Sequence, residues 1–393
     1  MYKLGKNKIE YLLNFKSLLK ICLLAENNHL IRKKFHYKLI ILKNYLVENK
    51  KDLIFFIIRH RLVSFFATNI IFQEYFPDIF LDLKNNIQNE TFRALKLTSL
   101  TCNVSEILKK EKINAIFFKG IPLSLQTTGK IYSRGKGDLD ILINPKDLEK
   151  AIKILENNDF ILVKNKFPKN YNSFWGRYSK LVSNQLSLYK KDSNNIYWID
   201  LHWSLSIIKG ILPKFNYLWE SRIALNINGY QIYTLNKEIA YLHLCLHSSN
   251  DRWKYLRSYV DLFKLSQKLN NKMIQNLNKY SLIKSCSYNV LKDFENNNLR
   301  LLSKNNNFNF NQKDINEIQT LPVKYFGYKV FDLKIKFDNL FYIFNLSKKP
   351  ISFIPNLLKE IIPPESIVDI NGENKNIIRI IFERYQKLIK LYF

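Results

Sequence analysis

The first 110 residues carry apolar side chains at the three- and four-residue spacing that is typical of amphipathic helices. The spacing is clearest at Ile9, Leu12, Leu13, Phe15, Leu18 and Leu19. Phe76-Pro77 interrupts the pattern, and a further helix is predicted from about Leu81 to Glu111. Residues 1–111 are therefore predicted to form a helical N-terminal region.

The pattern changes near Ile113, where short runs rich in β-branched and aromatic residues begin to alternate with helical segments. Helices are predicted at 121–128 and 146–157, and Pro145 stands at the start of the second, where proline is well tolerated. Strands are predicted at 113–118, 138–143, 160–163, 180–190, 196–204 and 229–235. Residues 112–235 are thus expected to hold a mixed sheet of about four to six strands.

Helical spacing returns after Asn236, so residues 236–393 are predicted to form a C-terminal helical region. Within it, the asparagine-rich stretch 305–311 is predicted to be a low-complexity loop, and Pro363-Pro364 marks a break. The expected fold class is α+β, with a mixed sheet flanked by N- and C-terminal helical regions.

The chain of 393 residues has a net charge of +29, from 62 Lys and Arg against 33 Asp and Glu. Such an excess favours association with a polyanion such as RNA or DNA. The codon bias of an AT-rich genome would also enrich Lys and Asn, although it does not explain the shortage of acids. No zinc finger or ribonucleoprotein motif is present, so nucleic acid stays a possible partner without a specific signature.

The four cysteines form no CxxC pair, which argues against a zinc ribbon or a disulfide framework and fits a reducing compartment. The most apolar run, Leu53 to Phe72, carries Arg59, His60 and Arg61 near its middle. Central arginines are costly in hydrocarbon, so the run is predicted to be a buried helix and not a membrane span. No signal peptide is recognisable in the polar N-terminus, and a cytoplasmic location is expected.

The most informative chemistry follows a glycine-flanked turn, where Asp138 and Asp140 open an apolar run. On a strand, residues i and i+2 point to the same face, about 6.5–7 Å apart. Carboxylates that close can share one hard cation or hold two cations about 3.5–4 Å apart. An exposed acidic turn is the alternative, but Leu139, Ile141 and Ile143 indicate an interior strand, where paired carboxylates need a neutralising metal or base.

Two other predicted strands carry related features. The strand at 113–118 ends in Lys119-Gly120, and the strand at 196–204 carries a single central carboxylate, Asp200, with His202 two residues further on. His202 shares the face of Asp200, so it would either orient that aspartate or contact substrate; a purely structural role is the alternative.

A strand, turn and helix, then a strand with Asp-x-Asp, then a later strand with one Asp form a layout that resembles the DNA polymerase β-like nucleotidyltransferases. More closely, the order Lys-Gly, Tyr-x-Arg, Asp-Leu-Asp-Ile-Leu-Ile, Asp-Leu-His-Trp is similar to a large bacterial family described as uncharacterised nucleotidyltransferases. The resemblance continues in Tyr-Leu-His-Leu-Cys-Leu-His at 241–247 and covers roughly residues 50–270. It implies a polymerase β-like sheet in which Asp138, Asp140 and Asp200 hold Mg²⁺, in a two-metal site, together with an NTP.

The reaction that this resemblance implies moves a nucleoside monophosphate from an NTP such as ATP to an acceptor and releases pyrophosphate. Gly120 would let the backbone approach the triphosphate, and the N–H groups of the helix that follows would face the phosphates. Lys119 or Arg134 would add positive charge at the leaving pyrophosphate. The superfamily's usual Gly-Ser pair is Gly120-Ile121 here, so Ser124, one helical turn on, is the candidate replacement.

Further nucleotide-binding candidates lie after residue 240. His243 and His247 have an i, i+4 spacing that suits a metal, but the HExxH glutamate is missing, so packing is favoured on spacing alone. The resemblance nonetheless makes His247 a candidate cleft residue. Trp253 and Arg257 would stack on or pair with a nucleotide, with interhelical packing and a surface arginine as the alternative.

Three functions are consistent with the sequence: a nucleotidyltransferase, a non-catalytic nucleotide- or RNA-binding module that retains the fold, and a tRNA-directed toxin-like nucleotidyltransferase. The complete set of three aspartates favours an enzyme, because a module without activity is expected to lose at least one. The acceptor, a small molecule or RNA, and the preferred NTP have no signature in the sequence.

Overall fold

A computed structural model of the chain describes residues 6–26, 28–135, 137–163, 170–192, 195–208, 210–251 and 255–277, together with residues 168 and 280 and short pieces between 354 and 386. The chain divides into two compact units, and each is assembled from three separate segments. The first comprises Met1–Thr98, Gly120–Gly137 and Lys237–Val330. The second comprises Ser99–Lys119, Asp138–Asn236 and Phe331–Phe393.

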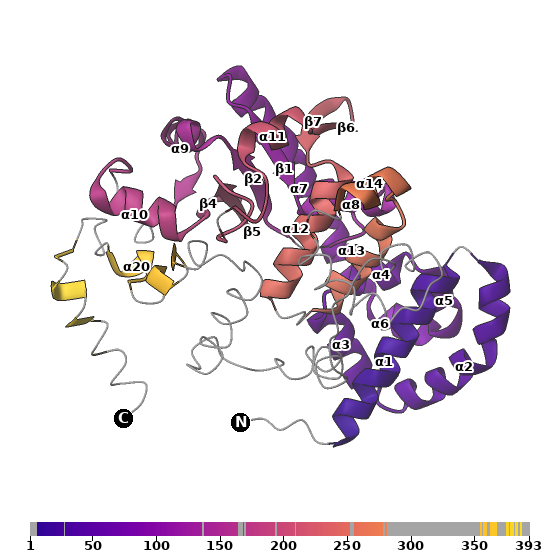
Figure 1. Cartoon of the computed structure of the whole chain (residues 1–393). Helices are drawn as coiled ribbons and strands as arrows, with labels where there is room; N and C mark the ends of the chain where they lie inside the picture. The colour runs from indigo at the N-terminus through magenta and orange to yellow at the C-terminus, as the bar shows by residue number, and fades with distance from the viewer. Residues whose placement is uncertain are drawn as a thin grey trace. The chain divides into compact units, whose positions relative to one another are not determined.

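The described part of the first unit is helical. Its helices are α1 (Lys6–Ala25), α2 (His29–Val47), α3 (Lys50–Arg59), α4 (Val63–Ala67), α5 (Ile70–Tyr75), α6 (Pro77–Asp82), the first part of α7 (Lys84–Lys110), α8 (Gly120–Thr128), α12 (Lys237–Asn250), α13 (Leu256–Ser266) and α14 (Asn271–Leu277). Helices α1 and α2 pack side by side (Figure 1). Stacked or tilted aromatic rings of Phe15, Phe56, Phe66 and Phe72 fill the space between the N-terminal helices.

Side-chain caps explain where two of these helices begin. Asn28 accepts a hydrogen bond from the Ile31 amide at the start of α2, and Asn69 accepts one from the Phe72 amide at the start of α5. Each asparagine satisfies an amide that has no partner within its helix. The apolar run from Leu53 to Phe72 is accordingly broken into α3, α4 and the start of α5, and most of it is buried. The prediction of one continuous helix over this run was therefore wrong.

The second unit contains the sheet. Five strands have the order β1-β2-β5-β4-β3 and are β1 (Ala115–Phe118), β2 (Leu139–Ile143), β3 (Ile161–Leu162), β4 (Gln185–Asp192) and β5 (Asn195–His202). Strands β2 and β5 pair in parallel, and the other three pairs are antiparallel. A hairpin of β6 (Ile223–Ile227) and β7 (Tyr230–Thr234) contacts β1 through β7. The expected α+β fold with a mixed sheet is confirmed.

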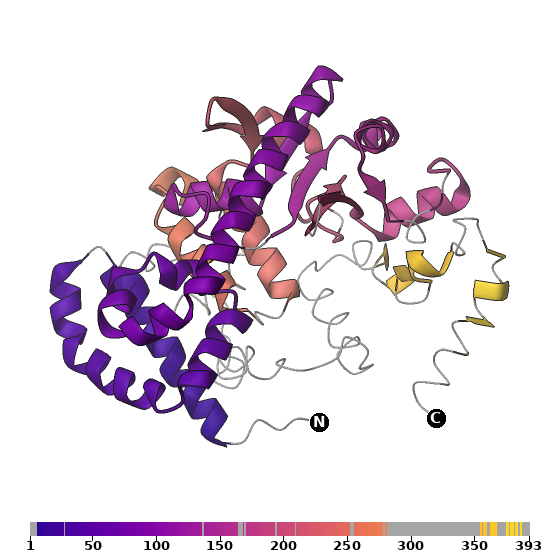
Figure 2. The same ribbon diagram turned by 180° about the vertical axis from the view of Figure 1, so that it is seen from behind.

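The second unit also contains helices, of which α9 (Leu148–Glu156) contacts β3. The others are the second part of α7, the 3₁₀ turn η1 (Pro145–Asp147), α10 (Phe174–Val182), α11 (Phe215–Glu220) and α20 (Pro364–Ile367). Helix α20 lies beside α10 in both views (Figures 1 and 2). Every residue of β1 and β2 is buried, so both faces of these strands are covered. A carboxylate on β2 is consequently placed in the interior.

Most predicted strands are found within a few residues of their expected positions, but one prediction was wrong at its start. Residues 180–182 end helix α10 and are not part of a strand, which begins only at Gln185. Ser173 caps that helix by accepting a hydrogen bond from the Gly176 amide. Strand β6 was not predicted.

The predicted loop at 305–311 and much of the predicted C-terminal helical region lie outside the described residues. The three-part division at residues 111 and 235 stays a prediction. Among the described helices, none is both long and apolar enough to cross a membrane.

Candidate metal and nucleotide site

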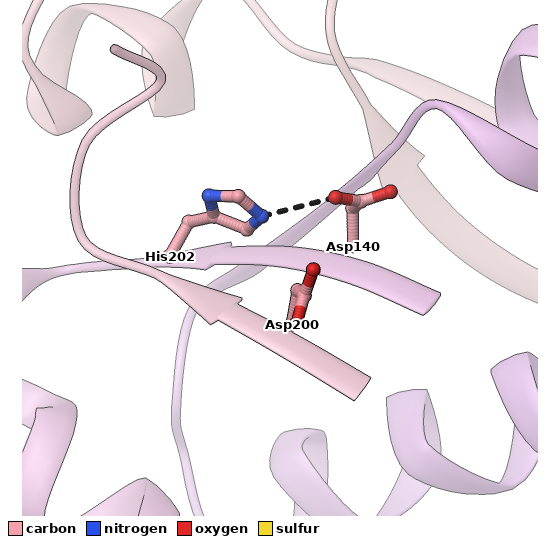
Figure 3. A group of neighbouring side chains, drawn as sticks. All are labelled: Asp140, Asp200 and His202. Carbon is pink, nitrogen blue, oxygen red and sulfur yellow. Dashed lines mark hydrogen bonds and ion pairs between the residues drawn. The ribbon is translucent and has the colours of Figure 1, made fainter. Parts of the chain in front are cut away.

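Two aspartates and one histidine form what we call the carboxylate cluster: Asp140, Asp200 and His202. Asp140 on β2 is the direct register partner of Asp200 on the parallel strand β5. His202 lies two residues further along β5, and Figure 3 shows all three side chains on the same side of the two strands. One ligand atom from each lies within 4.8 Å of the others. The cluster could therefore hold one metal ion.

Asp140 is the most strongly held member of the cluster. Lys119 Nζ and His202 Nε2 both donate to its Oδ1, at 2.8 and 3.0 Å. Burial favours the neutral acid, but Lys119 and His202 outweigh burial and hold the pKa of Asp140 well below its usual range. Asp140 is therefore a buried, ionised carboxylate at neutral pH. Its Oδ2 makes no hydrogen bond to the residues that the structure describes.

His202 is fully enclosed. Burial lowers the pKa of its imidazole, although the bond to Asp140 opposes this. Its other nitrogen, Nδ1, lies 3.5 Å from the side-chain amide nitrogen of Asn184, and its ring makes a T-shaped contact with the Phe118 ring, with 4.9 Å between centroids. These contacts fix the orientation of the ring and direct Nε2 at Asp140.

Asp200 is oriented from the neighbouring strand β4. Ser187 Oγ donates to Asp200 Oδ1 at 2.6 Å, and Gln185 Nε2 donates to Oδ2 at 2.8 Å. Ser187 is the register partner of Asp200, and Gln185 lies two residues away on the same face of β4. Sequence reasoning missed both residues. The available signal was that Gln185 and Ser187 are two residues apart and so share a face of β4. This spacing points to Asp200 only once the register between β4 and β5 is known.

Lys119 reaches Asp140 from the end of β1. Strand β1 is antiparallel to β2 and pairs Phe118 with Asp140, so Lys119 is the first residue beyond that pair. Its backbone is left-handed, with φ of 57°, and Gly120 follows with φ of 30°. A residue with a Cβ rarely adopts this conformation, and such residues gather at functional sites.

The donor atoms of the cluster fit a divalent cation. Two carboxylates suit Mg²⁺, Mn²⁺ and other hard ions, and an imidazole nitrogen also suits Mn²⁺ and zinc. Asp140 and Asp200 already have hydrogen-bonding partners that orient them, as ligands in metal sites usually do. Asp138 differs, because it lies exposed just before β2 and outside the 4.8 Å group.

Comparison with known proteins gives the family. Residues 48–289, more than half of the chain, match the family described as "Uncharacterised nucleotidyltransferase". The chain belongs to this nucleotidyltransferase family. The resemblance seen in the sequence motifs is thereby confirmed, and a bacterial origin stays a prediction.

A solved structure is also similar to this nucleotidyltransferase. It is the crystal structure of an antigenic nucleotidyltransferase-like protein from Paracoccidioides brasiliensis, with 15% identity and a TM-score of 0.33. The similarity covers 50% of this chain and 88% of that one. No curated protein matches.

Two of the predicted nucleotide-binding residues of the nucleotidyltransferase meet in the first unit. Asp261, which is almost fully buried, accepts hydrogen bonds from Arg134 Nε at 2.9 Å and from Arg257 Nε at 3.0 Å, and Arg134 Nη2 lies 2.8 Å from its Oδ2. Burial lowers the pKa of Arg257, and the nearby Asp261 opposes this. Arg257 is thus an enclosed ion-pair partner, whereas one fifth of the Arg134 side chain (20%) is exposed.

The remaining predicted residues are in varied positions. Gly120 opens α8, and Ser124 is buried, with its hydroxyl donating to the Lys130 carbonyl at 2.6 Å and lying 2.7 Å from Ser133 Oγ. His247 is exposed on α12, stacks on His243 and lies 3.9 Å from Asp251. Trp253 lies outside the described residues. Nucleotide binding by these residues stays a prediction.

Proposed function

We propose that this protein is an Mg²⁺-dependent nucleotidyltransferase that moves a nucleoside monophosphate from an NTP to an acceptor. The observation that carries the proposal is the register pairing of Asp140 with Asp200 on adjacent parallel strands, in a chain of the nucleotidyltransferase family. Family membership supplies the reaction class, and the pairing supplies two carboxylates on one face of the sheet. Asp138 is proposed as a third carboxylate of the bound state.

In the proposed reaction, an acceptor oxygen forms a bond to the α-phosphorus, and the bond from this phosphorus to the β-phosphate bridging oxygen breaks. Pyrophosphate leaves, and the acceptor proton goes to a base. Mg²⁺ held by Asp138, Asp140 and Asp200 would neutralise phosphate charge. Asp200 is the proposed base, because Ser187 and Gln185 hold its carboxylate and it is only partly buried.

The nucleotide would be held by positively charged groups and by backbone. We assign Lys119 and Arg134 to the phosphates, because each is a partly exposed cation next to a buried carboxylate. Gly120 would allow close approach of the phosphates to the start of α8. The acceptor is proposed to be a small molecule or RNA, and the net charge of +29 supports RNA. We expect a cytoplasmic enzyme.

The test is transfer from each of four α-³²P-labelled NTPs with Mg²⁺, using a small-molecule extract and total RNA as separate acceptors. Asp140→Asn and Asp200→Asn should each lower transfer at least about 100-fold, because metal sites contribute several kcal/mol to transition-state stabilisation. Asp159→Asn is the matched control: Asp159 belongs to the same unit, its side chain is 88% exposed, and its φ of 67° suits asparagine.

Two results would contradict the proposal. One is full transfer activity in Asp140→Asn. The other is a wild-type protein that labels neither acceptor pool and whose melting temperature does not rise with any Mg²⁺–NTP. A rise in melting temperature without labelling would instead favour the non-catalytic nucleotide-binding module.

A further inference from the structure

Asp140 already has a cationic partner within the protein. Lys119 Nζ lies 2.8 Å from Asp140 Oδ1, and the two side chains are 20% and 6% exposed. The second partner on that oxygen, His202 Nε2, lies 3.0 Å away. Lys119 is the lysine whose ammonium group lies against this buried carboxylate, which requires a neutralising charge.

The backbone holds Lys119 in place for this contact. Lys119 follows the last residue of β1, and its φ of 57° turns the chain sharply after the Phe118–Asp140 pair. Its ammonium group also lies 5.5 Å from the centre of the Phe118 ring. Left-handed backbone at a residue with a Cβ is unfavourable and persists only where the surrounding structure enforces it. The position of Lys119 beside Asp140 is thus built into the end of β1.

A divalent ion bound by Asp140 and Asp200 would share this carboxylate with Lys119. Two cations on one carboxylate repel each other, and the repulsion is strong in a buried site because screening by water is weak. Lys119 differs from the metal in one respect: its long, flexible stem can carry the ammonium group to another anion nearby. A triphosphate is such an anion.

We propose that Lys119 is a resident counterion of Asp140 that competes with the divalent metal and exchanges Asp140 for the triphosphate when nucleotide binds. The inference rests on the proposed function, since it assumes a metal at Asp140 and Asp200. Lys119 is then more than a phosphate ligand: it sets the metal affinity of the free protein. Because couplings between ligands are reciprocal, triphosphate and metal each strengthen the binding of the other.

The exchange makes one variant change two affinities in opposite directions. Lys119→Gln keeps a hydrogen-bond donor for Asp140 but removes the charge. Mn²⁺, added alone, should bind Lys119→Gln at least about tenfold more tightly than wild type, the factor that Coulomb's law gives for charges of +1 and +2 about 5 Å apart even in water. Inorganic tripolyphosphate in EDTA should bind the same variant several-fold more weakly.

Free Mn²⁺ is counted by electron paramagnetic resonance, and tripolyphosphate binding by calorimetry. Lys119→Arg keeps the charge and should resemble wild type in the Mn²⁺ titration. Lys190→Gln controls for net charge, because Lys190 lies in the same unit on β4 and pairs with Asp159 instead. Lys119→Met is a second neutral variant if Lys119→Gln does not fold.

If the neutral variants bind Mn²⁺ no more tightly than wild type, the inference is overturned, but the proposed metal site is not. Mn²⁺ binding that is absent from wild type and neutral variants alike overturns the metal site and the inference together. Unchanged tripolyphosphate binding in the neutral variants overturns the exchange. Tighter Mn²⁺ binding with weaker tripolyphosphate binding supports it.

Discussion

Replacing Asp261 by asparagine is expected to destabilise the first unit by about 3 kcal/mol, because it removes the charge that two arginines share. The carboxylate of Asp261 is 2% exposed and accepts two hydrogen bonds, one from Arg134 Nε and one from Arg257 Nε, and Arg134 Nη2 lies 2.8 Å from its Oδ2 in the ion pair. Asparagine keeps the shape of the side chain, but it has one accepting oxygen in place of two, and it has no charge.

The magnitude follows from the surroundings of each arginine. Breaking a buried ion pair by removing one partner costs about 3–5 kcal/mol, because the remaining charge is left buried. Arg257 fits that case: its side chain is 6% exposed, and its buried Nη1 has no hydrogen-bond partner among the described residues even in the wild type. Arg134 is 20% exposed and can turn toward water, so the loss of its ion pair adds little to the free-energy cost. The lower end of the range therefore applies.

Hydrogen exchange at the amides of α13 measures the opening free energy of this unit, with the β4–β5 peptides of the second unit as internal reference. Arg257→Met combined with Asp261→Leu removes both buried charges and should recover stability to within about 1 kcal/mol of wild type. Unchanged exchange in Asp261→Asn would refute the reasoning, as would a double variant that is no more stable than the single one.

Two further predictions concern a turn and an ionisable side chain. Gly135→Ala should lower the free energy of unfolding in a urea titration by about 2–3 kcal/mol, because Gly135 has φ of 66° and a Cβ there would collide with the hydrogen-bonded side chains of Glu90 and Ser64. Gly137→Ala is the control: its Cβ would meet nothing closer than 3.8 Å, so its free energy of unfolding should stay close to that of the wild type. Tyr178→Phe should cost about 1 kcal/mol at pH 7, because the hydroxyl lies 2.8 Å from the carbonyls of Leu358 and Ile362. Burial raises the pKa of Tyr178 to about 12, so the hydroxyl stabilises the folded protein fully below about pH 10, and this stabilisation is lost as the pH rises toward 12. A difference in the free energy of unfolding between wild type and Tyr178→Phe that is the same in urea titrations at about pH 8 and at about pH 11.5 would contradict this prediction.

The sequence was sufficient for the strands that carry the aspartates, because their chemistry is local. Asp140 lies in a strand that is buried at every residue, and Asp200 lies in the second half of β5, whose first half alternates between half-buried and exposed residues. Apolar runs of this kind identify strands without any knowledge of their partners. The parallel pairing that brings Asp140 and Asp200 together agrees with the family resemblance.

The contacts that orient the site depend on register and on distant residues, which local patterns do not encode. Ser187 faces Asp200 because β4 pairs with β5 in one particular register, and the predicted strand began five residues before Gln185. Arg134 and Asp261 are 127 positions apart in the chain, and no periodicity connects them. Asp138 is exposed, as in the alternative of an acidic turn, because alternation predicts which face a residue occupies and not where the strand begins.

The interleaved segments of the two units also determine when each can be completed during synthesis. The amide of Leu256 on α13 donates to His60 Nδ1, and the two residues are 196 positions apart. At about 5–20 residues per second, a ribosome needs roughly 10–40 s to make the chain between them. The helices that emerge first therefore wait that long for part of their apolar cover, and chaperone supply will influence the yield of folded protein in the cell.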